Sequence, residues 1–141
     1  MKTIIKIDGG SRGNPGPSAF GVYFVNQNKS YAEVLGVRTN NEAEYSGLIF
    51  ALKKVKALLG KDKAKVSEIE IKSDSELLVK QMNGIYKIKD PKIQQLFLEA
   101  WNLKVEFKKL TISHIRREQN KEADSLVNQA LDAKTRSQKL F

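Results

Sequence analysis

The order of strands and helices constrains the fold of this chain most strongly. β-Branched and aromatic residues between turn-forming stretches predict strands at 3–8, 19–25 and 31–37 in the first half. The second half predicts helices at 41–59, 75–81, 91–103 and 120–133 and strands at 66–73 and 109–115. Three successive strands followed by alternating helices and strands predict an α/β fold, with helices packed on a mixed sheet.

Length and composition indicate one globular domain. The 141 residues suffice for a single core, and we assign 1–134 to the domain and 135–141 to a tail that either docks or is disordered. The absence of cysteine excludes disulfides and thiolate metal sites and favours a reducing compartment. The first residues, MKTIIKIDGG, are too polar for a signal peptide or membrane helix, so we expect a cytoplasmic monomer without membrane contact.

The net charge of +9 has two interpretations of similar weight. A surplus of this size favours a polyanionic partner, because counterions displaced from phosphate chains promote binding. A lysine-rich surface that only keeps the protein in solution explains the same number.

Four acidic residues occupy positions that call for an explanation. Glu44 extends the apolar stripe of the first helix, although it could instead favour the helix dipole and bend towards water. Asp8 and Asp74 each end a strand, at the sheet edge where ligands bind in open α/β folds, although Asp is also common in turns and caps. Asp124 lies in the first turn of the last helix, where a surface acid is the simpler interpretation.

If these four acids lay close together in the folded chain, a metal site would become the preferred interpretation of all of them. Carboxylates gathered at one sheet edge repel each other, and magnesium, which prefers oxygen ligands, relieves the repulsion. A single histidine and no cysteine make a zinc site of the usual kind a poor alternative.

Four motifs, in this order, resemble ribonuclease H of type 1. They are DGGSRGNPGP, TNNEAEY, KSDSELLV and NKEADSLV, and together they span residues 8–127. The resemblance implies a ribonuclease H-like fold, with a five-stranded mixed sheet whose first three strands are antiparallel. It also implies hydrolysis of the RNA strand of RNA–DNA hybrids by two magnesium ions, giving 5′-phosphate and 3′-hydroxyl ends. Manganese as a substitute ion and double-stranded RNA as a second substrate stay open.

The resemblance also assigns residues. It implies that Asp8, Glu44, Asp74 and Asp124 hold the metals, with Asp8 bridging and Asp124 more mobile. The residues that match hybrid contacts are Gly9, Gly10, Asn14, Thr39, Asn41 and Glu76. Gly9 and Gly10 belong to a loop that lets the backbone approach the minor groove, where the 2′-hydroxyl identifies RNA. Asn14 and Thr39 match a pocket for a phosphate of the DNA strand, although Asn14-Pro15-Gly16 alone would read as a turn.

Two features depart from the common pattern. The segment between the fourth and fifth strands is too short for the basic helix and loop that many bacterial members carry, which places the chain in a compact subgroup. Lysines there, with Tyr86 and Trp101, could compensate in part, but a solvated helix face and core aromatics are the preferred interpretation. For the auxiliary group near Asp124 we favour Arg117, with His114 as the alternative, because His114 falls on a predicted strand.

Two other functions compete with this hypothesis. One is a nucleic-acid-binding module on the same fold that has lost catalysis, although four acids argue against it. The other is a nuclease acting on DNA junctions or in integration, and the glycine-rich loop with TNNEAEY favours the ribonuclease.

Overall fold

A computed structural model describes residues 2–140 and contains one five-stranded sheet of order β3-β2-β1-β4-β5. β1 (Lys2–Ser11) pairs antiparallel with β2 (Gly16–Phe24), and β2 pairs antiparallel with β3 (Lys29–Arg38). On its other side β1 pairs parallel with β4 (Glu68–Ser73), which pairs parallel with β5 (Lys109–His114). The predicted mixed sheet, with its first three strands antiparallel, is confirmed.

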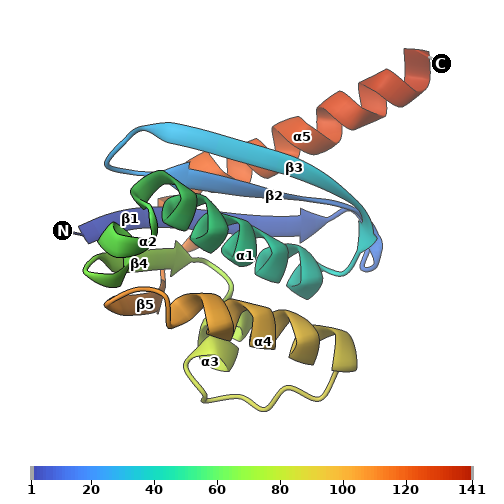
Figure 1. Ribbon diagram of the computed structural model, residues 1–141. Helices are drawn as coiled ribbons and strands as arrows, with labels where there is room; N and C mark the ends of the chain where they lie inside the picture. Colours follow the sequence, from blue (N-terminus) through green and yellow to red (C-terminus); the bar gives the residue numbers. More distant parts are fainter. Residues whose placement is uncertain (1, 141) are drawn as a thin grey trace.

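Helices cover both faces of this sheet (Figure 1). They are α1 (Asn40–Leu59), α2 (Lys61–Lys65), α3 (Glu76–Met82), α4 (Pro91–Lys104) and α5 (Lys121–Leu140), with a 3₁₀ turn, η1 (Arg117–Gln119), before α5. α1 lies on the face towards the viewer and packs against β1 and α4, whereas α5 crosses behind β1, β2 and β3. None of the helices within residues 2–140 is long and apolar enough to cross a membrane.

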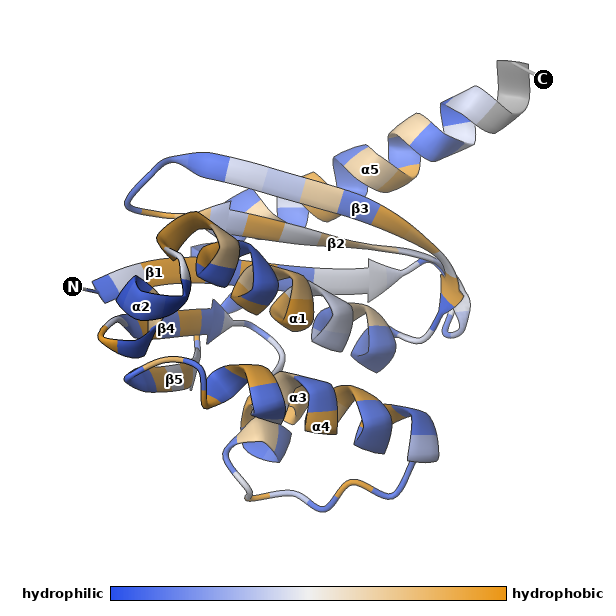
Figure 2. Cartoon of the chain, viewed as in Figure 1, coloured by the Kyte–Doolittle hydropathy of each residue, from blue (hydrophilic) through white to orange (hydrophobic). Residues whose placement is uncertain are grey.

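The main core lies between the sheet and α1. Alternate residues of β1 and β4, such as Ile5, Ile7 and Ile71, are buried against Leu48 and Leu52 of α1. Figure 2 shows the same alternation as apolar and polar bands along the strands. This one-sided burial explains why a period of two was visible in the sequence.

A smaller apolar cluster lies under α5, on the other face. It consists of Ala19, Val127 and Leu131, with Ala130 packed against it. Gly21 lets α5 approach β2 closely, since a Cβ at Gly21 would lie 2.5 Å from the carbonyl oxygen of Ala123. Glycine at position 21 therefore allows the close approach of α5, and Val127 and Leu131 pack the helix against Ala19 of the sheet.

Three expected boundaries were wrong. The first strand was expected to end at Asp8 but continues to Ser11, because Gly9, Gly10 and Ser11 still pair with β2. The strand expected from residue 66 begins at Glu68, because residues 61–65 form the unpredicted helix α2, which buries Ala64 and leaves Val66 exposed. The last helix was expected to end near Ala133 but continues to Leu140, because this stretch is rich in helix formers and free of Gly and Pro. The segment 135–140 is therefore helical, Phe141 lies outside the described residues, and the division into a domain and a tail stays a prediction.

Candidate functional site

Parallel pairing of β1 and β4 brings the first two acids together. Ile7 pairs with Ser73, so Asp8 and Asp74 follow paired residues at the same edge of the sheet. Asp8 still belongs to β1, whereas Asp74 comes directly after β4. The parallel pairing of β1 and β4 therefore makes the two carboxylates neighbours.

The first turn of α1 places Glu44 beside Asp8. Thr39 caps this helix in a capping box with Glu42, which fixes where the helix begins. Gly9 lets β1 approach the helix, because a Cβ at Gly9 would collide with the backbone of Ala43 and Glu44. The glycine after Asp8 is therefore a packing requirement as well as a loop residue.

A buried amide anchors the helix that carries Asp124. Asn120 is fully buried, and its Nδ2 donates to the backbone carbonyl of Ile7 at 2.8 Å. One turn later the backbone N–H of Asp124 donates to the carbonyl of Asn120 at 3.0 Å. Asp124 is thus held close to the strand that carries Asp8.

All four acids line one cavity of about 420 Å³. They come from β1, the start of α1, the end of β4 and the start of α5. The other lining residues are Gly9, Gly10, Ser11, Arg12, Asn40, Ser75, Arg117, Val127, Asn128 and Leu131. The structure therefore brings together the four carboxylates that the sequence singled out.

The crowding of these carboxylates changes their acidity. Burial, followed by the charges of Asp74, Asp124 and Glu44, raises the pKa of Asp8 to about 8, against a lowering by the Gly9 N–H, which donates to Asp8 at 2.9 Å. Burial raises the pKa of Glu44 to about 7, with a further contribution from Asp74, while a hydrogen bond with Ser75 acts in the opposite direction. Protons or cations are needed to neutralise such a cluster.

This donor set fits a hard divalent cation. Carboxylate oxygens are the ligands that magnesium prefers, and a cation would stabilise the ionised forms of Asp8 and Glu44, which burial and then neighbouring negative charge disfavour. Within residues 2–140, no three Asp, Glu or His side chains already form a group arranged to hold an ion. Asp124 lies towards Arg117, with 3.9 Å between Nη2 and Oδ1.

The two candidates for the auxiliary group lie in different places. Arg117, in η1, lines the cavity beside Asp124. His114 ends β5, is exposed and lies outside the set of lining residues, and its charge acts on Glu76. The geometry thus favours the sequence-based preference for Arg117.

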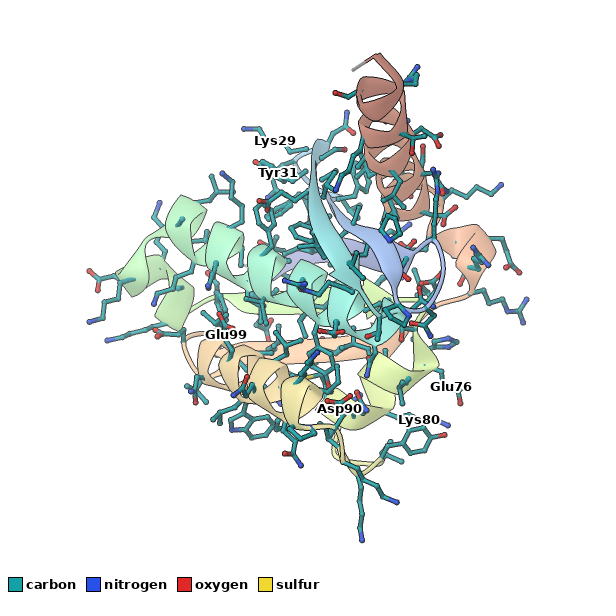
Figure 3. All side chains as sticks on the ribbon, turned by 90° about the vertical axis from the view of Figure 1, so that its right-hand side faces the viewer. Lys29, Tyr31, Glu76, Lys80, Asp90 and Glu99 are labelled. Atoms are coloured by element: carbon teal, nitrogen blue, oxygen red, sulfur yellow. The ribbon has the colours of Figure 1, made fainter. Side chains whose placement is uncertain are left out.

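The expected substrate-contacting residues are only partly gathered at the cavity. Gly9 and Gly10 line it, and Asn14 lies just beyond, where its Oδ1 accepts from the backbone N–H of Asn40 at 3.0 Å, next to the Thr39 cap. Glu76 lies apart from the cavity-lining residues, exposed on α3 and paired with Lys80 at 2.6 Å (Figure 3).

Asn41 belongs to a buried hydrogen-bonded group. Its Nδ2 donates to Gln81 Oε1 at 3.4 Å, and the hydroxyl of Tyr45 donates to the same oxygen at 3.0 Å. Its Oδ1 is buried without a hydrogen-bond partner in the described structure.

Several lining residues were not singled out from the sequence. Asn40 accepts from the backbone N–H of Ser11 at 2.8 Å and so ties the glycine-rich loop to α1. Asn128 follows Asp124 by one helical turn, a spacing that could have identified it. Arg12 reaches the cavity through tertiary structure alone.

Known proteins share this architecture. A family described as reverse transcriptase-like matches residues 6–130. Ribonuclease HI of Halobacterium salinarum is 39% identical over 129 residues, covering 89% of this chain and 62% of that protein. LC11-RNase H1, solved in complex with an RNA/DNA hybrid, matches with TM-score 0.87 and 40% identity over 94% of this chain and 99% of that one. The chain belongs to the ribonuclease H family, type 1.

This ribonuclease H resembles one part of a longer relative. Bifunctional protein Rv2228c of Mycobacterium tuberculosis is 39% identical over 97% of this chain, which spans 37% of that protein. The N-terminal RNase H domain of that protein, solved as a fusion, matches with TM-score 0.84 and 36% identity over 96% of this chain and 97% of that one.

The expected shortening of this ribonuclease H is also visible. Only residues 83–90 separate α3 from α4, and this described segment contains no helix of its own.

Proposed function

We propose that this ribonuclease H is a metal-dependent endonuclease that hydrolyses the RNA strand of RNA–DNA hybrids and leaves 5′-phosphate and 3′-hydroxyl ends. One observation carries the proposal. Asp8, Glu44, Asp74 and Asp124 come from four separate parts of the chain yet line a single cavity, and burial, followed by the charges of the other three acids, raises the pKa of Asp8 to about 8. Burying such a cluster lowers the free energy of unfolding. A role in metal-dependent chemistry explains why the protein nevertheless contains it.

In this mechanism the protein positions ions, substrate and protons. Asp8, on which the charges of all three other acids act, would hold two magnesium ions together with Glu44, Asp74 and Asp124. When bound, the two ions supply an activated water and stabilise the leaving 3′ oxygen. Asp124, with about a third of its side chain exposed, would be the more mobile ligand. Manganese as a substitute ion stays a prediction.

Contacts around the cavity support a hybrid as the substrate. Gly9 and Gly10 line the cavity, and their backbone would lie against the sugar edge of the minor groove, where a 2′-hydroxyl distinguishes RNA. Asn14 and Thr39 lie together at the start of α1 and would hold a phosphate of the DNA strand. Asn41, whose Oδ1 has no hydrogen-bond partner in the described structure, and Glu76 would add polar contacts. The solved complex of LC11-RNase H1 with an RNA/DNA hybrid supports the same substrate class.

Arg117 would be the auxiliary group. Its guanidinium lies at the cavity beside Asp124, where it can stabilise negative charge on the product phosphate and assist its release. His114 stays the alternative. The expected monomeric state and cytoplasmic location also stay predictions.

A cleavage assay with magnesium tests the proposal. Labelled RNA–DNA hybrid, double-stranded RNA and double-stranded DNA are incubated with wild type, Asp8→Asn and Glu118→Gln, an exposed acid outside the cavity lining. We expect wild type and Glu118→Gln to cut the RNA of the hybrid, and Asp8→Asn to bind the hybrid without cutting it. Equal activity of Asp8→Asn and wild type would defeat the assignment. Cleavage of DNA alone would favour the junction nuclease, and binding without any cleavage would favour the inactive binding module.

A further inference from the structure

Arg12 occupies an unusual position at the rim of the acidic cavity. It lies in the loop between β1 and β2, where its backbone N–H donates to the carbonyl of Pro17 at 2.8 Å. Its side chain lines the cavity and ends 2.6 Å from a carboxylate oxygen of Asp132. Asp132 follows Asn128 by one turn of α5, as Asn128 follows Asp124, so the three share one helix face. Arg12 therefore marks the far end of the face that begins with Asp124.

The charges around the cavity indicate that Arg12 can attract a phosphate. Four carboxylates repel the phosphates of a nucleic acid, and the only cationic residues lining the cavity within residues 2–140 are Arg12 and Arg117. Arg117 lies beside Asp124, close to the acids. Arg12, farther along α5, is placed to meet a different phosphate.

The partner of Arg12 can be displaced. The side chains of Arg12 and Asp132 are 43% and 59% exposed, and ion pairs this exposed contribute little to stability. A phosphodiester presents two oxygens to the guanidinium fork, which suits bidentate binding. Exchange of Asp132 for a phosphate therefore requires only a local movement of one side chain.

We propose that Arg12 binds a backbone phosphate of the strand being cut, and that Asp132 holds the guanidinium until substrate replaces it. This rests on the proposed function, because it adds a contact to the same substrate. The phosphate belongs to the cut strand, since Arg12 shares one cavity with the acids that surround the scissile bond.

Opposite effects of two substitutions test this proposal. Binding of a labelled hybrid is measured by fluorescence anisotropy at several salt concentrations, with Asp8→Asn present in every protein to prevent cleavage. Arg12→Gln should weaken binding about tenfold and make the slope of log K against log salt shallower by about one. Asp132→Asn should tighten binding about two- to fivefold, because it removes the competing partner. If the pair served only to tie the loop to α5, both substitutions would weaken binding, and that result would overturn the proposal.

A control variant and a second probe sharpen the test. Lys53→Gln breaks a comparable exposed pair, Lys53–Glu99 at 3.0 Å, formed away from the cavity (Glu99 is labelled in Figure 3), and should change binding less than Arg12→Gln. Hybrids with one neutral methylphosphonate, moved stepwise along the RNA strand, locate the contact. The loss caused by Arg12→Gln should disappear at one or two adjacent positions, and an equal loss at every position overturns the proposal. Absence of hybrid cleavage by the unmodified enzyme would instead defeat the proposed function, so the two failures are distinguishable.

Discussion

The Nδ2 of Asn120 donates to the backbone carbonyl oxygen of Ile7 at 2.8 Å and thereby joins the start of α5 to β1, one residue before Asp8. The two residues are 113 positions apart in the sequence. Because Asp124 lies one turn into α5, this hydrogen bond, together with the packing of α5 on the sheet, holds the last carboxylate of the cluster near the first.

Asn120→Ala should impair turnover beyond its effect on stability. Loss of the buried hydrogen bond should lower the free energy of unfolding by about 1–3 kcal/mol and let Asp124 drift from Asp8. Asn83→Ala is a control for the loss of an amide-to-carbonyl hydrogen bond at a more exposed position, because Asn83 Nδ2 donates to the carbonyl of Ile112 at 3.0 Å, away from the cavity. Urea unfolding and kcat are measured for both variants. An equal fall of kcat in the two would show that Asn120 acts only on stability.

The stability of the metal-free protein should fall as pH rises. In the unfolded chain these carboxyls ionise near pH ~4, whereas the folded-state pKa is about 8 for Asp8 and about 7 for Glu44. Between these limits the folded state holds protons that the unfolded state has lost, so folding becomes less favourable with each step up in pH. The free energy of unfolding of Asp8→Asn should therefore equal that of wild type near pH ~4 and be higher by a few kcal/mol near pH ~8. Urea titrations in chelator across this range measure the difference, and a constant difference contradicts the raised pKa.

Metal binding should weaken as pH falls. Protons compete with the cation for Asp8 and Glu44, so the apparent affinity for magnesium should drop as pH decreases through the pKa values of about 8 and about 7. Calorimetric titration with magnesium should also show proton release, which differs between buffers of different ionisation enthalpy. Asp62→Asn, in the first turn of α2 and away from the cavity, should bind as wild type does. Affinity that does not change with pH would exclude these two acids as ligands.

Replacing Gly9 and Gly10 separately by alanine should affect the stability of the protein differently. A Cβ at Gly9 collides with the backbone of Ala43 and Glu44, so Gly9→Ala should destabilise the protein by about 1–3 kcal/mol by pushing α1 from β1. A Cβ at Gly10 would meet only a side-chain carbon of Val127, at an ordinary 3.7 Å. Thermal unfolding of both variants measures the contrast. Equal destabilisation would mean that the close approach of β1 and α1 is not the reason for glycine at position 9.

Arg117→Ala should lower kcat, whereas His114→Ala should leave it nearly unchanged. The reason is position, because Arg117 lines the cavity beside Asp124 and His114 lies at the exposed end of β5. Arg117→Lys, which keeps the charge, should restore part of the activity. Steady-state rates on an RNA–DNA hybrid decide between them, and a larger loss in His114→Ala would reverse the assignment.

The sequence predicted those parts of the fold that depend on local pattern. Alternation in β1 and β4 and the long amphipathic α1 were visible because each buries one face against the other layer. The helix α2 was missed because its five residues are mostly lysine and show no period. The length of α5 was underestimated, since a polar composition was read as a loose tail although it contains neither Gly nor Pro.

The four acids of the site could be predicted, but the residues that position them could not. Asp8 and Asp74 were identifiable because each follows a strand-forming run of residues, and parallel pairing of β1 with β4 then makes them neighbours. Asn120 and Arg12 act through partners more than a hundred positions away, Ile7 and Asp132, and no local pattern encodes such contacts. Amide and guanidinium side chains at helix starts and in loops are common, so their roles became apparent only in three dimensions.

The register between β1 and β4 determines where this protein can change in length. Removing one residue from either strand would turn its terminal carboxylate to the opposite side of the sheet and separate Asp8 from Asp74. The stretch 83–90 lies outside both strands and could gain residues without disturbing that pairing. Insertions and deletions among descendants of this protein should therefore accumulate in that loop and be purged from the two strands.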